Sequence, residues 1–547
     1  MIHKDKNILV VIPARGGSRG IPRKNLRALA GKPLIYYSIK TASASRYRLD
    51  LYVSSDDGEI RSIAQQIGSS VIERDSRISG DATTLDPVVY DALLQAEERE
   101  AKRYDIVVTL QPTSPLLKTL SLDAALYRML EDDSLDSIIA AKENTHLGWK
   151  REEGRYLPNY RARLNRQYLD PLFMETGGFL ITRREYVTQR SRIGEKVDLF
   201  LLEGGEAIDI DTYEDWHLCE YYLKRKRILF VVSGYREIGL GHVYNTLLIA
   251  NDILNHSVEF LVDGKSDLAY EKIAGNHYTV HRQQCNDILE DIEKLEPDLV
   301  INDRLDTTLE YMRELKKFIG KIINFEDRGE GSVEADLLIN AIYSEENAPS
   351  HHFYGYRYFL LRDEFLLAPP RALSERVERV LITFGGVDRH NYTCRVIDAI
   401  EEYCAARGIA IVVVAGFGYA HYESLRHFRG VEIYRDANNI SEHMREADIV
   451  FTSAGRTTYE IAHLQVPAIV LAQNEREMTH SYATERYGFD NLGPGYEVSE
   501  SEIARSLEKL VESPMVRRRR RERMAQLDMT QGRREVVRLI NQTMEQL

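Results

Sequence analysis

The first half of the chain alternates short apolar runs with longer stretches in which apolar residues recur every three or four positions. A short apolar run bounded by turn residues is typical of a buried strand, and the longer spacing is typical of an amphipathic helix. The predicted strands are residues 8–12, 50–54, 70–73 and 105–110, and the predicted helices are residues 33–44, 58–67 and 84–99. This order predicts an α/β fold with a Rossmann-like, mostly parallel sheet covered by helices.

A second alternation begins at Ile228, directly after a charged helix end that closes at Lys226. A proline-containing join at residues 368–370 divides this half again. The predicted strands are residues 228–232, 299–302 and 321–324 before the join, and residues 380–384, 409–415, 449–452 and 468–471 after it.

The length of the chain also requires more than one hydrophobic core. It has 547 residues, and single cores seldom grow beyond ~300 residues. We therefore predict one domain at residues 1–226 and a second at residues 227–547. The second is predicted to hold two doubly wound lobes, about residues 227–370 and 371–547, as a GT-B-like pair with a cleft between them.

Composition narrows the class of protein. A net charge of −13 argues against general nucleic-acid binding. The basic run Arg517–Arg521 is predicted to be a solvated helix face. Four cysteines without CxxC spacing indicate neither a disulfide framework nor a zinc site. Because no apolar run reaches ~18 residues and no signal-peptide pattern precedes the first strand, we expect no membrane insertion and a cytoplasmic location.

The segment after the first predicted strand is rich in glycine and in basic residues. Its glycines allow a sharp turn that brings backbone N–H groups close to an anion. Four basic side chains lie within residues 15–24. A polyphosphate needs both amides and cations, so this segment predicts a nucleoside triphosphate site, although its spacing is not that of a Walker loop. The candidate residues are Arg15, Gly17, Ser18, Arg19, Lys24 and Asn25.

This motif resembles the opening of the CMP-sialic acid synthetase (acylneuraminate cytidylyltransferase) family, and further motifs recur in order over roughly residues 1–226. The resemblance implies transfer of CMP from CTP to a 2-keto nonulosonic acid of the sialic, legionaminic or pseudaminic type, with release of pyrophosphate. It also implies that Arg15, Arg19 and Lys24 hold the triphosphate, that Asn25 touches the base or ribose, and that the first domain forms a homodimer. Many relatives have Lys at the position of Arg19.

Four further motifs carry the resemblance. Residues 54–57 contain two aspartates that are either a helix N-cap or ligands. Arg74 and Asp81 keep the family's spacing near the nucleotide. Gln111, at the end of a predicted strand, could hydrogen-bond the sugar acid. Arg166 could hold the carboxylate of the sugar acid.

Asp209 and Asp211 form the last motif of this half. On a strand, residues two apart point to the same face, and two carboxylates beside a triphosphate are typical of a Mg²⁺ site. We therefore predict that both ligate Mg²⁺, which would position the α-phosphorus for attack by the anomeric hydroxyl of the sugar acid. The residue sequence identifies no general base for this step.

In the second half, residues 234–243 form a glycine-rich turn into a predicted helix, which is a possible anion site. The Gly239-Leu240-Gly241-His242-Val243 stretch, with later motifs to about residue 495, resembles the UDP-sugar hydrolase of pseudaminic acid synthesis, a relative of the MurG glycosyltransferases. The resemblance implies that His242 activates a water molecule; the alternative is a helix-capping or packed histidine. The implied nucleotide-binding residues are Gly241, Gly455, Thr457, Thr458 and Glu460.

Several positions depart from that family. Asn245 stands where Arg is common, residues 302–304 differ from the usual strand end, and Arg456 and Tyr459 replace a typical Ser and Trp. The combined hypothesis is a bifunctional enzyme of nonulosonic acid synthesis whose second domain hydrolyses a UDP-2,4-diacetamido-trideoxyhexose. The alternatives for that domain are a glycosyltransferase and a non-catalytic binding or assembly module. For the first domain the alternative is a sugar-1-phosphate nucleotidyltransferase.

Overall fold

A computed structural model describes residues 6–547 except residues 19, 81 and 438. The chain divides into two compact units, residues 1–225 and 226–547. The predicted boundary after residue 226 lies one residue beyond this division. Within the described residues, no helix is long and apolar enough to cross a membrane.

The first unit is built on a seven-stranded sheet with the order β11-β7-β10-β6-β1-β4-β5. All neighbouring strands are parallel except those that pair with β10. The strands are β1 (Ile8–Pro13), β4 (Leu49–Ser55), β5 (Ser70–Glu73), β6 (Ile106–Leu110), β7 (Ser137–Glu143), β10 (Phe173–Arg183) and β11 (Val197–Leu201). The predicted mixed α/β fold is confirmed, because apolar runs of this length can be buried on both faces only inside such a sheet.

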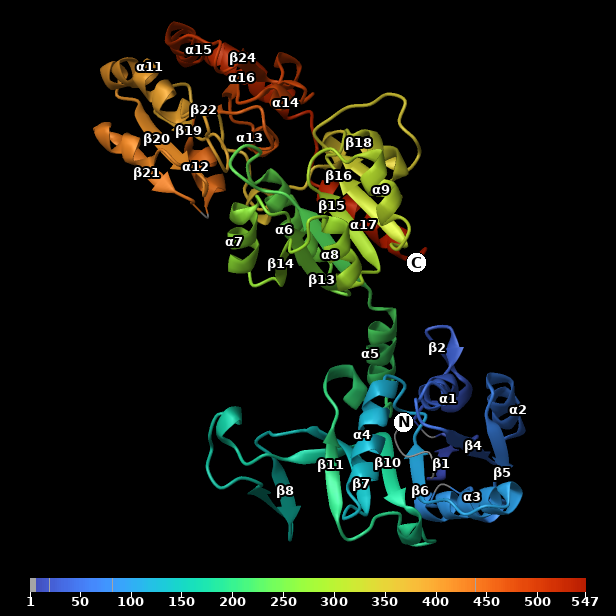
Figure 1. The fold of residues 1–547 in the computed structure, drawn as a ribbon. Coiled ribbons are helices and arrows are strands. Elements are labelled where there is room, and N and C mark those ends of the chain that lie inside the picture. The colour runs from blue at the N-terminus through green and yellow to red at the C-terminus, as the bar shows by residue number, and fades with distance from the viewer. Residues whose placement is uncertain (1–5, 19, 81, 438) are drawn as a thin grey trace. The chain divides into compact units, whose positions relative to one another are not determined.

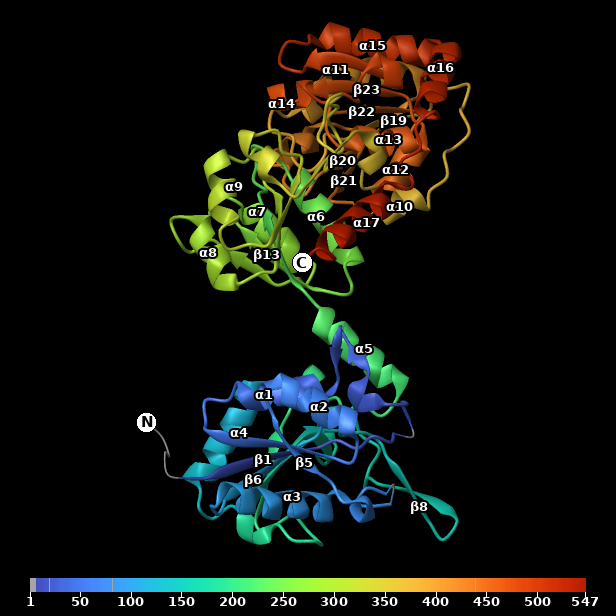
Figure 2. The same cartoon turned by 90° about the vertical axis from the view of Figure 1, so that its right-hand side faces the viewer.

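Helices cover both faces of this sheet. The helix α3 (Leu85–Glu100) lies on one face, and α1 (Ile35–Ser43) and α2 (Gly58–Ile67) lie on the other (Figure 2). The helix α4 (Thr119–Glu131) packs with α1 in the same core. Asp57 is the N-cap of α2, where its carboxylate accepts hydrogen bonds from the N–H groups of Glu59 and Ile60. The N-cap interpretation of residues 54–57 is therefore correct for Asp57.

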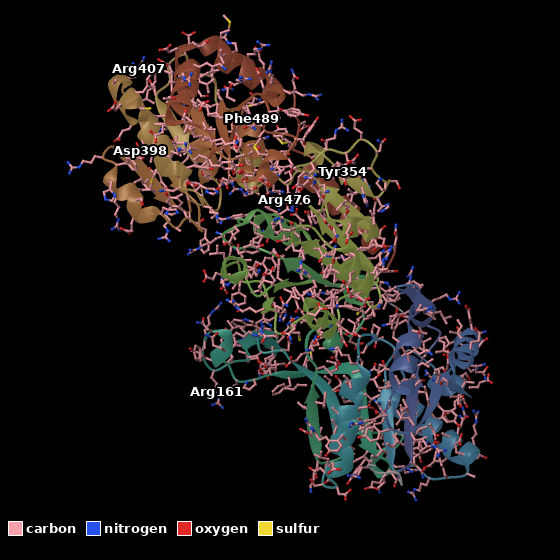
Figure 3. All side chains as sticks on the ribbon, turned by 45° about the horizontal axis from the view of Figure 1, so that its top comes forward. Arg161, Tyr354, Asp398, Arg407, Arg476 and Phe489 are labelled. Carbon is pink, nitrogen blue, oxygen red and sulfur yellow. The ribbon has the colours of Figure 1, made fainter. Side chains whose placement is uncertain are left out.

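An antiparallel hairpin, β8 (Trp149–Glu152) and β9 (Arg155–Pro158), extends from the sheet (Figure 1). We call residues 144–174 the arm. Arg161 lies at its outer end (Figure 3). Large apolar side chains of the arm are exposed to solvent, among them Trp149, Tyr156 and Tyr168.

The second unit contains two parallel sheets, as predicted. The first lobe has the order β14-β13-β12-β15-β16-β17-β18 and the second β21-β20-β19-β22-β23-β24. The first set is β12 (Arg227–Val232), β13 (Ser257–Val262), β14 (Val280–Arg282), β15 (Leu299–Asp303), β16 (Lys321–Phe325), β17 (Leu337–Asn340) and β18 (His352–Tyr354). The second set is β19 (Arg379–Ile382), β20 (Ala410–Ala415), β21 (Val431–Arg435), β22 (Ile449–Thr452), β23 (Ala468–Ala472) and β24 (Phe489–Pro494).

Each of the three large sheets contains a point where the order of its parallel strands reverses: between β1 and β6, between β12 and β15, and between β19 and β22. The loops that follow these strands diverge there and leave a crevice at the carboxyl edge of the sheet. In folds of this kind ligands bind at such points.

The helix α17 (Gly532–Met544) returns from the second lobe to the first (Figure 1). Its residues Val536, Leu539 and Ile540 are buried in the core of the first lobe, with Phe230 and Phe325. The predicted range of the second lobe, residues 371–547, therefore matches that lobe only when α17 is excluded from it. Apolar spacing shows that such a helix is amphipathic but not which lobe its apolar face covers.

The prediction of a solvated basic face at Arg517–Arg521 is wrong for two of its residues. These residues lie in α16 (Pro514–Met524), where Arg518 and Arg519 are exposed but Arg517 and Arg520 are buried. The guanidinium of Arg517 donates to the carbonyl oxygens of Leu510, Val511, Ser374 and Glu375 at 2.5–3.0 Å. The first two are unpaired carbonyls at the end of α15 (Glu500–Glu512), so the arginine stabilises that helix terminus.

We expect Arg517→Ala to lower the free energy of unfolding of the second unit by about 3–5 kcal/mol, because it leaves four carbonyl groups without their donor and opens a cavity. Arg519→Ala, on the exposed face of the same helix, should change it by less than about 0.5 kcal/mol. Urea unfolding of both variants measures the difference. Equal stabilities would show that the buried guanidinium contributes nothing.

Candidate functional sites

The glycine-rich loop after β1 is held in place by its neighbours. The N–H of Gly16 donates to Oδ1 of Asp56 at 3.0 Å. Asn25 is buried, and its Nδ2 donates to the carbonyl of Arg15 at 3.0 Å. Asn25 therefore shapes the loop from within, whereas the resemblance implies that it touches the base or ribose.

This loop meets the segment around Asp211. A Cβ atom on Gly20 would lie 2.6 Å from the carbonyl oxygen of Asp211, so only glycine allows this approach. Lys24 Nζ donates to the carbonyl of Ile210 at 2.6 Å and lies 3.6 Å from Oδ1 of Asp211. The side chain of Asp211 is 80% exposed and that of Lys24 is 13% exposed. A cation and a carboxylate thus stand together beside the segments that follow β1 and β6.

Residues 208–211 do not form the predicted strand. They run between a 3₁₀ turn (Gly204–Ala207) and the helix α5 (Tyr213–Lys224). The N–H of Ile210 makes a single hydrogen bond, to the carbonyl of Thr113 at 2.8 Å, in place of a strand ladder. The segment is still ordered, because Ile210 is buried and Thr212 and Asp215 form a capping box at the start of α5.

Asp209 is the less exposed partner of this pair, half-buried where Asp211 is exposed. Burial raises the pKa of its carboxyl; the hydroxyl of Thr113 opposes that rise, and the negative charge of Asp211 adds to it. Its Oδ1 is buried and, among the described residues, has no hydrogen-bond partner. The hydroxyl group of Ser114 is in the same state, and the backbone of Gly177 packs against Asp209 Oδ1 and Ser114 Oγ.

These oxygen donors fit a magnesium ion. A bound cation would remove the charge repulsion between Asp209 and Asp211 and would occupy the unpartnered Oδ1. The described residues hold no group of three or more metal-ligating His, Cys, Asp or Glu side chains. The other ligands would therefore come from phosphate oxygens and water, as Mg²⁺ prefers.

The remaining predicted residues of the first unit have different surroundings. Arg74 is buried, and burial lowers its pKa; it donates to the carbonyl of Ser54 at 2.6 Å, so it holds the end of β4. The main-chain N–H of Gln111 donates to the carbonyl of Gly177, and its main-chain carbonyl accepts from the hydroxyl of Ser38. Arg166 is exposed on the arm, and the described contacts do not join it to the loop after β1. Arg19 and Asp81 lie outside the described residues; Gly17 is exposed and Ser18 half-buried.

In the second unit a cavity of about 630 Å³ lies between the lobes. It is lined by the loops that follow β12, β15 and β16 in the first lobe and β19 and β22 in the second. Arg476 lies where the lobes meet (Figure 3), and it donates to Asp306 Oδ1 at 3.0 Å. The loops at the reversal points of both sheets in this unit thus line the same cavity.

His242 stands in the first turn of α6 (Gly241–Asp252) and lines this cavity with Gly241. Its Nδ1 hydrogen-bonds Asp303, whose side chain is fully buried at the end of β15. Asn245 Nδ2 donates to the other carboxylate oxygen of Asp303 at 2.7 Å. A carboxylate on Nδ1 sets the ring orientation and leaves Nε2 to receive a proton. His242 is therefore an oriented imidazole that lines the cavity.

Two departures from the family pattern contact each other across the lobes. Arg456, the N-cap of α13 (Thr457–Leu464), donates to Asn245 Oδ1 at 2.9 Å. It also lies 3.4 Å from Oε1 of Glu326, and its guanidinium covers the ring of Phe359. At this contact the second lobe supplies the positive charge of Arg456, and the first lobe supplies the amide of Asn245.

Some of the predicted residues in and just before α13 line the cavity. Gly455, Thr457 and Glu460 line it. Glu460 accepts a hydrogen bond from Nε of Arg362 at 2.8 Å. Thr458 is buried, and its hydroxyl donates to the carbonyl of Gly455 at 2.8 Å. The expectation that Thr458 meets the ligand is therefore wrong for its side chain, which stabilises the turn.

Residues 9–151 match a family model described as Cytidylyltransferase. They form a cytidylyltransferase-family domain. The chain is 30% identical over 230 residues to N-acylneuraminate cytidylyltransferase A of Danio rerio, covering 41% of this chain and 52% of that one. It is 29% identical over 234 residues to CMP-N,N'-diacetyllegionaminic acid synthase of Campylobacter jejuni, covering 40% and 97%.

The chain thus spans about half the length of the Danio rerio relative. Among solved structures, MurG of Acinetobacter baumannii is similar to the fold, with 13% identity, coverage of 58% of this chain and 99% of that one, and a TM-score of 0.43.

Sequence reasoning missed Asp303 and Glu326 outside the cytidylyltransferase-family domain. Both are acidic residues at or just after the carboxyl end of an apolar run, at residues 299–302 and 321–324. The strands β15 and β16 are parallel neighbours in register, so their ends meet at one edge. An acidic residue in that position was the available signal.

His480 supplies a pH-dependent prediction for the second unit. Its Nδ1 is 2.8 Å from the carbonyl oxygen of Ala454, and burial lowers its pKa to about 4. An unfolded histidine titrates near ~6.5. The stability that this neutral ring contributes is therefore present above pH ~6.5 and is lost as the pH falls toward 4.

The variant His480→Asn keeps an N–H donor but does not titrate. We expect wild type to lose about 2–3 kcal/mol more than this variant between pH 7.5 and 4.5 in urea unfolding; identical losses would contradict it.

Proposed function

We propose that the first unit transfers CMP from CTP to a 2-keto nonulosonic acid of the sialic, legionaminic or pseudaminic type and releases pyrophosphate. The observation that carries this proposal is the contact of Lys24 with Ile210 and Asp211. It joins the basic loop and the aspartate segment at one crevice of a cytidylyltransferase-family domain. The names of the related enzymes support the class of sugar acid.

In this reaction the anomeric hydroxyl oxygen of the sugar acid attacks the α-phosphorus of CTP. The bond from the α-phosphorus to the bridging oxygen breaks, its electron pair leaves with pyrophosphate, and the proton of the attacking hydroxyl passes to water. Arg15 and Lys24 would hold the charge that grows on the leaving group, which favours the transition state over the ground state. Asp209 and Asp211 would hold Mg²⁺, which when bound neutralises phosphate charge.

A panel of acids tests this proposal. The full chain is incubated with CTP, Mg²⁺ and sialic, legionaminic or pseudaminic acid, and pyrophosphate release is measured. We expect release with at least one of these acids and none without an acid. Release with a sugar 1-phosphate and with none of the keto acids would establish the alternative nucleotidyltransferase instead.

We propose further that two copies of the chain associate through the arm. Its exposed aromatic and aliphatic side chains form an apolar surface of a kind that a monomer seldom keeps in water. We expect a dimer by light scattering for the wild type and a monomer for Trp149→Asp combined with Tyr168→Asp. Leu120→Asp, an exposed apolar residue on α4 away from the arm, is the control and should leave the dimer intact. A monomeric wild type would contradict the proposal.

For the second unit we propose hydrolysis of a UDP-2,4-diacetamido-trideoxyhexose. The oriented pair His242–Asp303 in the cavity between the lobes supports a water-activating role. The rival is a glycosyltransferase of the same fold. Incubation with the UDP-sugar, with and without an acceptor, separates them: free sugar released by water supports the hydrolase, and turnover only with an acceptor supports the transferase. If the chain neither binds nor turns over the UDP-sugar, this unit is a module of another kind.

A further inference from the structure

Glu326 is held rigidly at the carboxyl edge of the first lobe. It directly follows β16, and its backbone has φ 51°, a left-handed conformation that residues with a side chain seldom adopt. Its N–H donates to the carbonyl of Ile339 at 3.0 Å, and its own carbonyl accepts from Arg476 at 2.8 Å. Backbone strain of this kind persists only where the surroundings enforce it, and it gathers at functional sites.

The side chain of Glu326 is buried, with 4% exposed, and lines the cavity between the lobes. Its Oε1 lies 3.4 Å from Arg456 NH1. Its Oε2 is buried and, within the described part of the chain, has no hydrogen-bond partner. Burial raises the pKa of this carboxyl to about 7, and Asp303 adds to the rise, while the charge of Arg456 and the backbone N–H of Ile342 oppose it. A buried acceptor without a donor is costly, so the missing partner is informative.

We propose that Glu326 binds the sugar of a nucleotide sugar, with Oε2 accepting a hydrogen bond from a hydroxyl or amide N–H group. This inference rests on the proposed nucleotide-sugar function of the second unit. It adds a sugar-recognition residue that the sequence motifs do not contain.

The charges in the cavity decide which part of the ligand meets Glu326. A phosphate would be repelled by a carboxylate, and it has a better place at the N-terminus of α13, where Gly455 and Thr457 line the cavity. A carboxylate that is ionised can only accept hydrogen bonds. Sugar hydroxyl and acetamido groups supply donors, and Arg456 stabilises the ionised form of Glu326.

The test compares two probes on the full chain by titration calorimetry, UDP and UDP-N-acetylglucosamine. Glu326→Gln keeps the shape of the side chain but replaces one acceptor oxygen with a donor group. We expect it to weaken the affinity for UDP-N-acetylglucosamine by about 10- to 100-fold and to leave the affinity for UDP within about twofold. Glu330→Gln, an exposed residue in the same loop, is the control and should change neither.

The other outcomes are distinct. Equal affinities of wild type and Glu326→Gln for both probes would overturn this inference and leave the proposed function intact. A parallel loss for both probes would also overturn it, because Glu326 would then act on the lobes and not on the sugar. If the wild type binds neither probe, the proposed function of the second unit fails and this inference falls with it.

Discussion

Asp211→Ala is expected to lower CTP-dependent pyrophosphate release by about 1000-fold, since ligation of a phosphate-bound cation supplies several kcal/mol to such a reaction. Asp211 is exposed at the crevice and lies 3.6 Å from Lys24. Its side chain makes no hydrogen bond that shapes the fold among those described, so the variant should fold normally. The measurement is the initial rate at saturating CTP over a range of Mg²⁺ concentrations.

Three comparisons make this result specific. Asp209→Asn should produce a similar loss, because its Oδ1 has no other partner in the described structure. Glu214→Ala, which removes an exposed carboxylate in the first turn of α5, should keep the wild-type rate. UDP-sugar turnover by the second unit should not change in any of the three. Full activity of Asp211→Ala at ordinary Mg²⁺ concentrations would refute the metal assignment.

His242→Ala is expected to reduce UDP-sugar turnover by about 100- to 10,000-fold, the usual contribution of a general base. The affinity for UDP should remain, because the loss concerns proton transfer and not the nucleotide. Asp303→Asn should also lower the rate, since it removes the carboxylate that orients the ring through Nδ1. The readout is free sugar formed per unit time, with CMP transfer by the first unit as an internal standard.

A second histidine provides the matched control. His281 Nε2 pairs with Glu259 at 2.7 Å, so it is also a histidine with a carboxylate partner, but it is not among the residues that line the cavity. His281→Ala should leave turnover unchanged. If His242→Ala keeps the wild-type rate, the pair His242–Asp303 is structural and the hydrolase proposal loses its base.

Much of the fold could be predicted because its signals are local. The apolar runs at residues 8–12 and 228–232 became the strands β1 and β12 almost residue for residue. The glycine-rich loops that follow them both lie at points where strand order reverses. Residues 208–211 were harder, because their apolar and acidic alternation is typical of a strand. The backbone there binds Thr113 at one point only, and a ladder requires a second strand that alternation cannot show.

The sites were predictable to a smaller extent, because a site depends on contacts between distant segments. Asp303 orients His242, Arg456 pairs with Asn245, and Lys24 reaches Ile210 across 186 positions. Arg517 shows the same limit in the core. A run of arginines is typical of an exposed helix face, and only the fold shows that four carbonyl groups surround this one.

The sequence by itself determined the two-part α/β architecture and the places where loops rich in glycine and charge meet strand ends, because burial periodicity and backbone freedom act over a few neighbouring residues. Only the tertiary structure decided which carboxylates pair, which stay unpartnered and which arginines are buried. Those states depend on desolvation and on charges brought together by folding, and neither is encoded in the spacing of residues along the chain.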